Sequence, residues 1–72
     1  MTLETAKHVV TERFLGRLGL HGVGLRRKDD AVCLYIDATA REDDVQALVG
    51  DVRREIAPHQ VVVIREAPAT LA

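Results

Sequence analysis

The stretch that decides the fold is AVCLYIDATAREDDVQALVGDVRREIAPHQVVVIRE, residues 31–66. Its first part alternates aliphatic residues at 32, 34 and 36 with Cys33, Tyr35 and Asp37, which is the two-residue period of a strand. Its last part, residues 61–64, is a run of aliphatic side chains and favours a strand that is apolar on both faces. A strand, a helix and a strand in this order should cross over right-handed, so we expect the two strands to be parallel neighbours.

The middle of this stretch predicts a helix. Aliphatic residues at 45, 48, 49, 52 and 56 fall on one helical face. Thr39 and Glu42 have the spacing of a capping box, with Thr39 as the N-cap. Acidic residues at 43 and 44 and arginines at 53 and 54 suit the two ends of the helix dipole, and Pro58 is expected to stop the helix.

The N-terminal segment, residues 2–18, predicts a second amphipathic helix. Thr2 is the expected N-cap, and Gly16 or Gly19 is expected to end the helix in a left-handed conformation. One face gathers the apolar residues Leu3, Ala6, Val10, Phe14 and Leu18.

A hairpin is predicted between the two helices. Aliphatic residues at 23 and 25 alternate with Gly24 and Arg26, and the polar turn KDD, residues 28–30, leads into the strand at 32–36. Both helices are expected to cover the same side of the sheet. The predicted fold class is therefore α+β, with the order αββαβ and two helices packed on one face of a three-stranded mixed sheet.

Length and composition bound the rest of the interpretation. A chain of 72 residues is one domain, residues 1–72, with a thin core, and its tail at 67–72 is expected to fray. The single cysteine, Cys33, cannot form a disulfide within the chain, and a lone thiol is ordinary in a reducing compartment. Because the sequence has neither a membrane-spanning stretch nor a secretory signal, we expect a cytoplasmic protein without a membrane partner.

Charge is distributed unevenly along the chain, although the net charge is only -1. Residues 1–28 hold six basic and two acidic side chains, whereas residues 29–72 hold four basic and nine acidic ones. This polarity could orient a docking partner, but a solvated surface that keeps the domain soluble is the more common explanation.

No catalytic residue, metal site or cofactor is predicted. Cys33 and three scattered histidines do not form a set of ligands that closes on one zinc ion. A cysteine in the middle of a strand is usually a small packing residue. The consecutive carboxylates at 42–44 are explained by capping and by the helix dipole, and the oxygen-rich loop with a turn glycine that calcium needs is missing.

The glycine-rich stretch GRLGLHGVGLRRKDD, residues 16–30, raises the alternative of an anion or nucleic-acid site. A dinucleotide fingerprint needs a strand before the glycines and a helix after them, and the predicted order here is reversed. The letters GRLG also match the GxxG loop of KH domains, but they lead into a strand, and the net charge and scarce aromatic residues argue against nucleic acid. The basic residues that would carry this alternative are Arg17, Arg26, Arg27 and Lys28.

The open side of the sheet is the main functional clue. Because the last strand is apolar on both faces and the helices cover only one, the other face is predicted to be an interaction surface. Its expected residues are Cys33, Tyr35, Val61, Val63, Gly22 and Gly24, with Val62 and Ile64 in place of Val61 and Val63 if the strand faces the other way. The two glycines would let another backbone approach closely. The alternative is a monomer in which the N-terminal segment or the tail covers this face.

Residues 18–37, LGLHGVGLRRKDDAVCLYID, resemble the small domain that precedes some bacterial trypsin-like serine proteases. In that domain a helix is followed by a strand, a turn and a second strand, and VVVIRE at 61–66 lies where the closing strand is found. The resemblance brings no catalytic residue to this chain. The order of elements is also similar to that of BON domains, which are usually envelope-associated binding modules.

These observations predict a non-enzymatic module for protein interaction or oligomerisation, which uses an open sheet face or an edge strand. The expected partner is a second copy or another protein. Binding of nucleic acid or another anionic ligand through residues 17–28 is the second hypothesis, and an accessory domain of an enzyme is the third.

Overall fold

The computed structural model describes residues 1–67 and contains two helices and three strands. In chain order the elements are α1 (Leu3–Phe14), β1 (Leu20–Arg26), the short 3-10 helix η1 (Arg27–Asp29), β2 (Ala31–Ile36), α2 (Glu42–Ile56) and β3 (Gln60–Arg65). The tail that the sequence predicts to fray lies outside the described residues, except for Ala67.

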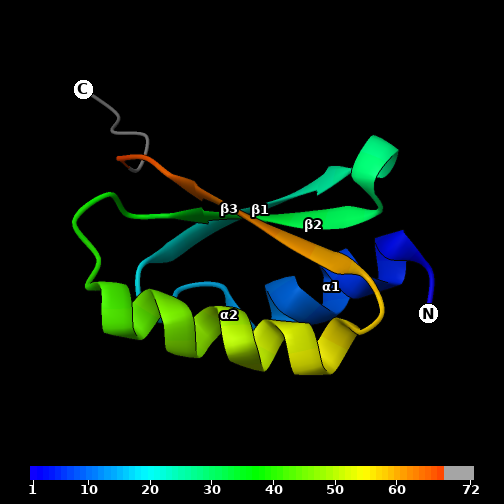
Figure 1. The fold of residues 1–72 in the computed structure, drawn as a ribbon, viewed down its shortest axis with the longest axis horizontal. Coiled ribbons are helices and arrows are strands. Elements are labelled where there is room, and N and C mark those ends of the chain that lie inside the picture. Colours follow the sequence, from blue (N-terminus) through cyan, green and yellow to red (C-terminus); the bar gives the residue numbers. More distant parts are fainter. Residues whose placement is uncertain (68–72) are drawn as a thin grey trace.

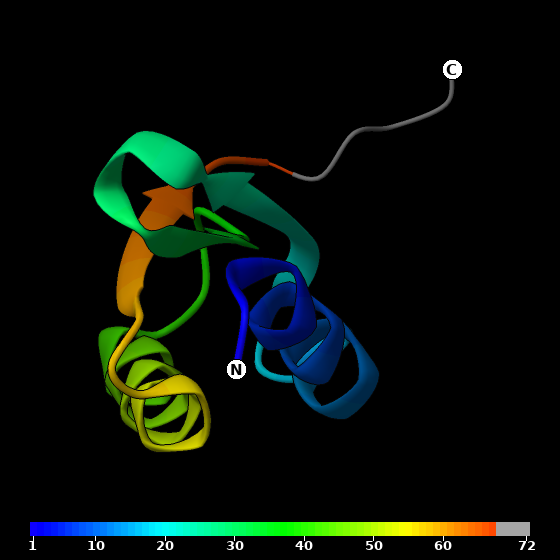
Figure 2. The same ribbon diagram turned by 90° about the vertical axis from the view of Figure 1, so that its right-hand side faces the viewer.

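The strands form one mixed sheet in the order β1-β2-β3. β1 and β2 pair antiparallel, and β3 pairs parallel to β2 after the crossover through α2. Both helices lie side by side against the same face of the sheet (Figures 1 and 2). The predicted α+β class, the order αββαβ and the placement of the helices are confirmed.

The first helix begins as predicted but ends earlier. The hydroxyl of Thr2 accepts a hydrogen bond from the backbone N–H of Thr5 at 3.1 Å, as an N-cap does. The helix ends at Phe14, and Gly16 then adopts a φ of 91°. Because Leu15 at the C-cap already has an extended ψ of 130° and the left-handed Gly16 follows it, Leu18 leaves the apolar face and is 43% exposed, contrary to the sequence prediction.

The capping box predicted for the second helix is wrong. Thr39 instead donates hydrogen bonds from its backbone N–H (2.9 Å) and its hydroxyl (2.8 Å) to Oδ1 of Asp37. The carboxylate of Asp37 thus holds Thr39 in a tight turn before the helix. The N-cap is Arg41, without a side-chain cap bond, and Glu42 becomes the first helical residue.

The hydrophobic core lies between the helices and the sheet. Both helices and all three strands contribute to it, and no polar or charged residue is buried in the part of the chain that the structure describes. The apolar stripe of α2 is confirmed at Val45, Leu48, Val52 and Ile56. The core fixes which face of each strand is turned to solvent, and this positions the candidate site.

Candidate functional site

The face of the sheet opposite the helices carries part of the predicted interaction surface. Gly22 lies opposite Tyr35, and Gly24 lies opposite Cys33, in the register of β1 and β2. Residues directly opposite each other share a face of a sheet. The structure therefore brings Cys33, Tyr35 and the two glycines together, as expected.

The facing of β3 is the reverse of the one expected first from the sequence. Val61 pairs with Val32 and Val63 with Leu34, and both valines pack against the core. The residues on the open face are Val62, opposite Cys33, and Ile64, opposite Tyr35. The sequence could not decide between these alternatives because all four residues of the run are aliphatic.

Tyr35 itself fills the space above the two glycines. A Cβ atom at Gly24 would lie 3.2 Å from Cε2 of Tyr35, and one at Gly22 would lie 3.4 Å from Cδ2 of the same ring. The glycines thus accommodate an aromatic ring of their own chain rather than the backbone of a second subunit. With Cys33 only 3% exposed, the middle of this face is covered from within the chain.

The four basic residues of the anion-binding alternative do not form one patch. Arg17 follows α1 near the start of β1, with its guanidinium 5.7 Å from the centre of the Phe14 ring. The other three lie at the far end of β1, a strand length of about 20 Å away. There Arg27 pairs with Glu4, and Arg26 lies 3.8 Å from Asp29, which leaves Lys28 without an ion pair among residues 1–67.

The outer edge of β3 carries unpaired backbone groups. The N–H of Gln60 donates to the carbonyl of Asp30, and the N–H of Glu66 donates to the carbonyl of Ile36, each at 3.0 Å. Because alternate residues of a strand direct their backbone groups to the same neighbour, the even-numbered residues face β2. The N–H and C=O groups of Val61, Val63 and Arg65 therefore point outward, and we call these groups the β3 edge.

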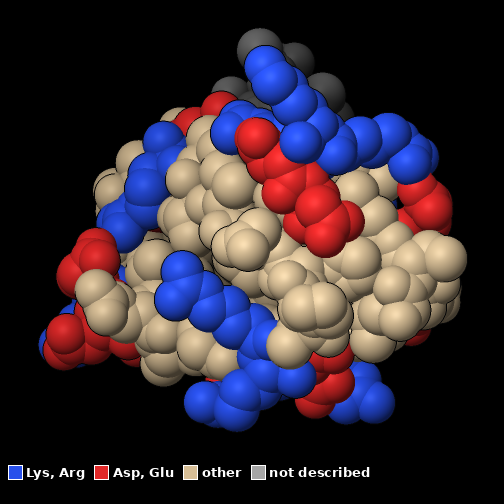
Figure 3. All heavy atoms as spheres, turned by 45° about the vertical axis from the view of Figure 1, so that its right-hand side comes forward, with Lys and Arg blue, Asp and Glu red and all other residues tan. Residues whose placement is uncertain are grey.

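A groove of about 370 Å³ runs between β3 and α2. We call it the α2–β3 groove, and its lining residues are Glu42, Val45, Gln46, Val49, Gly50, Arg53, Val63 and Arg65. Its middle is lined by three valines, Gly50 and Gln46, and charged side chains stand at its two ends. The space-filling view shows a broad uncharged area that is crossed by a basic side chain and bordered by further charged side chains (Figure 3).

Arg65 closes one end of the groove. Its Nη1 donates to Oε2 of Glu42 at 3.0 Å, and its Nη2 donates to the carbonyls of Ala38 and Ala40. These bonds tie the end of β3 to the beginning of α2. Neither Arg65 nor the groove is predicted from the sequence, because the contact joins two segments that only the crossover brings together.

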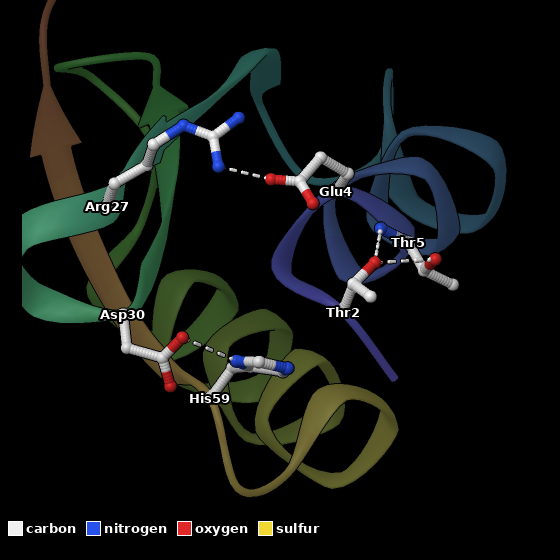
Figure 4. Close-up of polar contacts among 6 residues, drawn as sticks. All are labelled: Thr2, Glu4, Thr5, Arg27, Asp30 and His59. Atoms are coloured by element: carbon white, nitrogen blue, oxygen red, sulfur yellow. Dashed lines mark hydrogen bonds and ion pairs between the residues drawn. The ribbon is translucent and has the colours of Figure 1, made fainter.

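Polar contacts also tie the N-terminus and the hairpin to the turn before β3 (Figure 4). In the His59 ring, Nδ1 lies 2.9 Å from Oδ1 of Asp30, and Nε2 lies 2.8 Å from the carbonyl oxygen of Met1. Both acceptors are fully satisfied only when both ring nitrogens carry protons. The pKa of His59 is raised by the Met1 carbonyl first and by the Asp30 carboxylate next.

Glu4 contributes to the same end of the molecule. A hydrogen bond from Arg27 lowers the pKa of the Glu4 carboxyl and joins the first turn of α1 to η1 (Figure 4). Within residues 1–67, no group of three or more histidine, cysteine or acidic side chains is arranged to hold a metal ion. No helix in the same range is long and apolar enough to cross a membrane.

Comparison with known proteins assigns no family to the chain. A scan against protein-family models, a search of curated proteins and a search of solved structures each gave no match. The β3 edge and the α2–β3 groove are therefore the features from which a function is inferred. Chemically, they offer main-chain donors and acceptors beside an apolar surface, which suits an extended peptide segment.

Proposed function

We propose that this chain is a protein-interaction module that binds an extended partner segment along the β3 edge. The observation that carries the proposal is the row of outward N–H and C=O groups on Val61, Val63 and Arg65. A strand added at this edge would pair with these groups by main-chain hydrogen bonds. Its alternate side chains would contact the groove on one face and the open face on the other.

The composition of β3 supports this choice of edge. Natural proteins protect edge strands with proline, charged residues that point inward, bulges or short length. Between Gln60 and Arg65, β3 has four consecutive half-buried aliphatic residues and neither a proline nor a bulge. At the opposite edge of the sheet, β1 is interrupted by a register shift between Leu20 and Gly22. The contrast favours β3 as the binding edge.

Three residues of the open face extend the surface offered to a partner. Val62 and Ile64 are half-buried, and Tyr35 lies beside them across the β2–β3 pairing. A partner strand next to β3 would cover the exposed parts of Val62 and Ile64. Burial of each 100 Å² of apolar surface contributes about 2.5 kcal/mol before the costs of association. In this proposal, Val62 and Ile64 on the open face therefore contribute apolar surface to the binding site.

We place the module in the cytoplasm, because Cys33 is a free thiol and a lone thiol is ordinary in a reducing compartment. A relation to the domain that precedes some bacterial trypsin-like proteases, or to BON domains, stays a prediction from the sequence. The proposed binding mode depends on neither relation. The binding mode follows from the backbone of β3.

A proline scan of β3 tests the proposal. Val63→Pro removes an outward N–H and places a ring on the edge, so we expect it to keep the fold but weaken strand binding by about tenfold or more. The probe is a soluble peptide of alternating valine and threonine with lysines at both ends, labelled for fluorescence anisotropy. Saturable binding by the native chain is the expected result.

Val62→Pro is the matched control, because it introduces the same residue one position away. It removes an N–H that hydrogen-bonds to β2, so circular dichroism and thermal unfolding should show a larger loss of stability than for Val63→Pro, which loses the core packing of one valine but no hydrogen bond within the sheet. The proposal fails if the native chain, at a concentration low enough for it to be monomeric, does not bind the peptide, or if Val63→Pro binds it as tightly as the native chain does.

A further inference from the structure

We infer that the strand bound at the β3 edge is β3 of a second copy, paired antiparallel about a twofold axis at Val63. This inference rests on the proposed function and names its partner. The resulting sheet would have six strands and would carry all four helices on one face. Three features of the described residues support this choice: the strand register, the charges of the groove and the glycine in α2.

The register of the pairing between the two copies follows from which residues of β3 direct their backbone groups outward. A twofold axis perpendicular to the sheet keeps the helices of both copies on one side, so Val63 lies opposite Val63 of the second copy. Val61 then lies opposite Arg65 of the second copy. These three residues are the ones whose backbone groups point outward, so every group of the β3 edge gains a partner. On the open face, Val62 lies opposite Ile64 of the second copy.

Charge complementarity favours a second copy over an unrelated strand. Glu42 stands at the end of the groove beside Arg65, and Arg53 stands at the other end, about 16 Å away along α2. The twofold axis reverses α2 of the second copy, so Glu42 of each copy faces Arg53 of the other. Within residues 1–67, Arg53 makes no ion pair.

Gly50 lies in the middle of α2, where the two helices would meet. A Cβ atom there would find only Nη1 of Arg54 within 4 Å, at 3.9 Å, and the backbone has no positive φ. Nothing within its own chain therefore requires glycine, although glycine destabilises a helix interior. Close approach of a second helix would explain why position 50 is a glycine, because helices with small contact residues pack at the shorter interaxial distances.

Sedimentation equilibrium tests this arrangement. We expect the native chain to dimerise, and Arg53→Glu to raise the dimer Kd by about tenfold or more, because each interface would then hold two facing pairs of carboxylates. Arg17→Glu is the matched control. It makes the same change of charge at another arginine that has no ion pair within residues 1–67, beside Phe14 of α1 and outside the α2–β3 groove, and it should leave the Kd unchanged.

Gly50→Ala provides a second readout that a purely structural role would not produce. Alanine should stabilise the monomer as a better helix former, yet it should raise the dimer Kd by adding a methyl group between the helices. A chain that stays monomeric at millimolar concentration overturns the inference. A dimer whose Kd is indifferent to both Arg53→Glu and Gly50→Ala overturns it as well.

The peptide experiment separates failure of this inference from failure of the proposed function. If the chain is monomeric but binds the valine–threonine peptide in a manner sensitive to Val63→Pro, the second copy is wrong and the strand-binding edge remains. If neither dimerisation nor peptide binding responds to Val63→Pro, the β3 edge is not the binding site and both proposals fall.

Discussion

His59 joins three parts of the chain that are far apart in sequence. Its ring lies between Asp30, at the end of the hairpin turn, and the carbonyl of Met1, just before α1. The His59 side chain is 10% exposed, whereas that of Asp30 is 62% exposed, so the contact between them lies at the surface. A single histidine thus connects the turn before β3 to the hairpin and to the start of the chain.

The protonation of His59 gives a pH dependence with a definite sign. Its pKa in the folded chain is raised above the ordinary value, while the positive N-terminus opposes this shift. A raised pKa contributes stability that is fully present below the unfolded pKa of about 6.5 and is lost as pH rises through the folded pKa. We expect the difference in Tm between the native chain and His59→Gln to shrink as pH rises above neutrality.

Thermal unfolding of both proteins from pH 5 to pH 9, read by circular dichroism, measures this difference. Val62→Ala serves as a control, because it removes no titratable group and its effect should not vary with pH in the same way. A gap between the native chain and His59→Gln that widens with rising pH would contradict the assignment of the charged ring.

At the scale of elements, two glycines differ in whether their backbone conformation requires glycine. Gly16 has a φ of 91° and lies just after the end of α1, whereas Gly50 lies within α2 without a positive φ. Gly16→Ala should lower the free energy of unfolding by about 1–2 kcal/mol, because an L side chain is strained in that region. Gly50→Ala should raise it by about 0.5–1 kcal/mol.

Urea unfolding at low micromolar concentration, where association contributes least, measures both changes. A clash with surrounding residues cannot explain the loss of stability expected for Gly16→Ala, since a Cβ atom at this position would find no atom within 4 Å beyond its chain neighbours. Equal effects of the same sign at the two positions would show that backbone conformation does not end α1 in the way described.

Most elements could be predicted from periodicity, and the errors concern where helices begin and end. The stripes of α1 and α2 and the alternation of β2 correctly predicted their type and packing, because burial of one face dominates each element. Thr39 was wrongly assigned as a cap because Asp37, two residues earlier, competes for its hydroxyl. Local spacing alone does not show which of these two hydrogen bonds forms.

The candidate site was predictable only in part. An edge strand and Tyr35 were expected from the sequence, but the facing of Val61 and Val63 was not, because an aliphatic run has no alternation to indicate its buried side. The groove depends on Arg65 meeting Glu42, two residues whose proximity follows from the crossover rather than from any motif. Glycines at 22 and 24 were expected to admit another subunit, yet Tyr35 of the same chain fills that space.

At the scale of the whole molecule, the proposed dimer would link association to folding. A chain of 72 residues buries a modest core, so a dimer formed through β3 would raise the apparent stability with increasing concentration. The same dimer would pair the unprotected β3 edge, which otherwise remains open to aggregation. The proposed assembly therefore accounts for the composition of the last strand.

Amide hydrogen exchange in β3 tests the central claim most directly. Val61 and Val63 direct their N–H groups outward, whereas Val62 and Ile64 direct theirs to β2. We predict that the N–H groups of Val61 and Val63 exchange rapidly at low micromolar concentration and become protected at millimolar concentration, while those of Val62 and Ile64 are protected throughout. Rapid exchange at Val61 and Val63 at every concentration would contradict the claim that β3 binds a second copy.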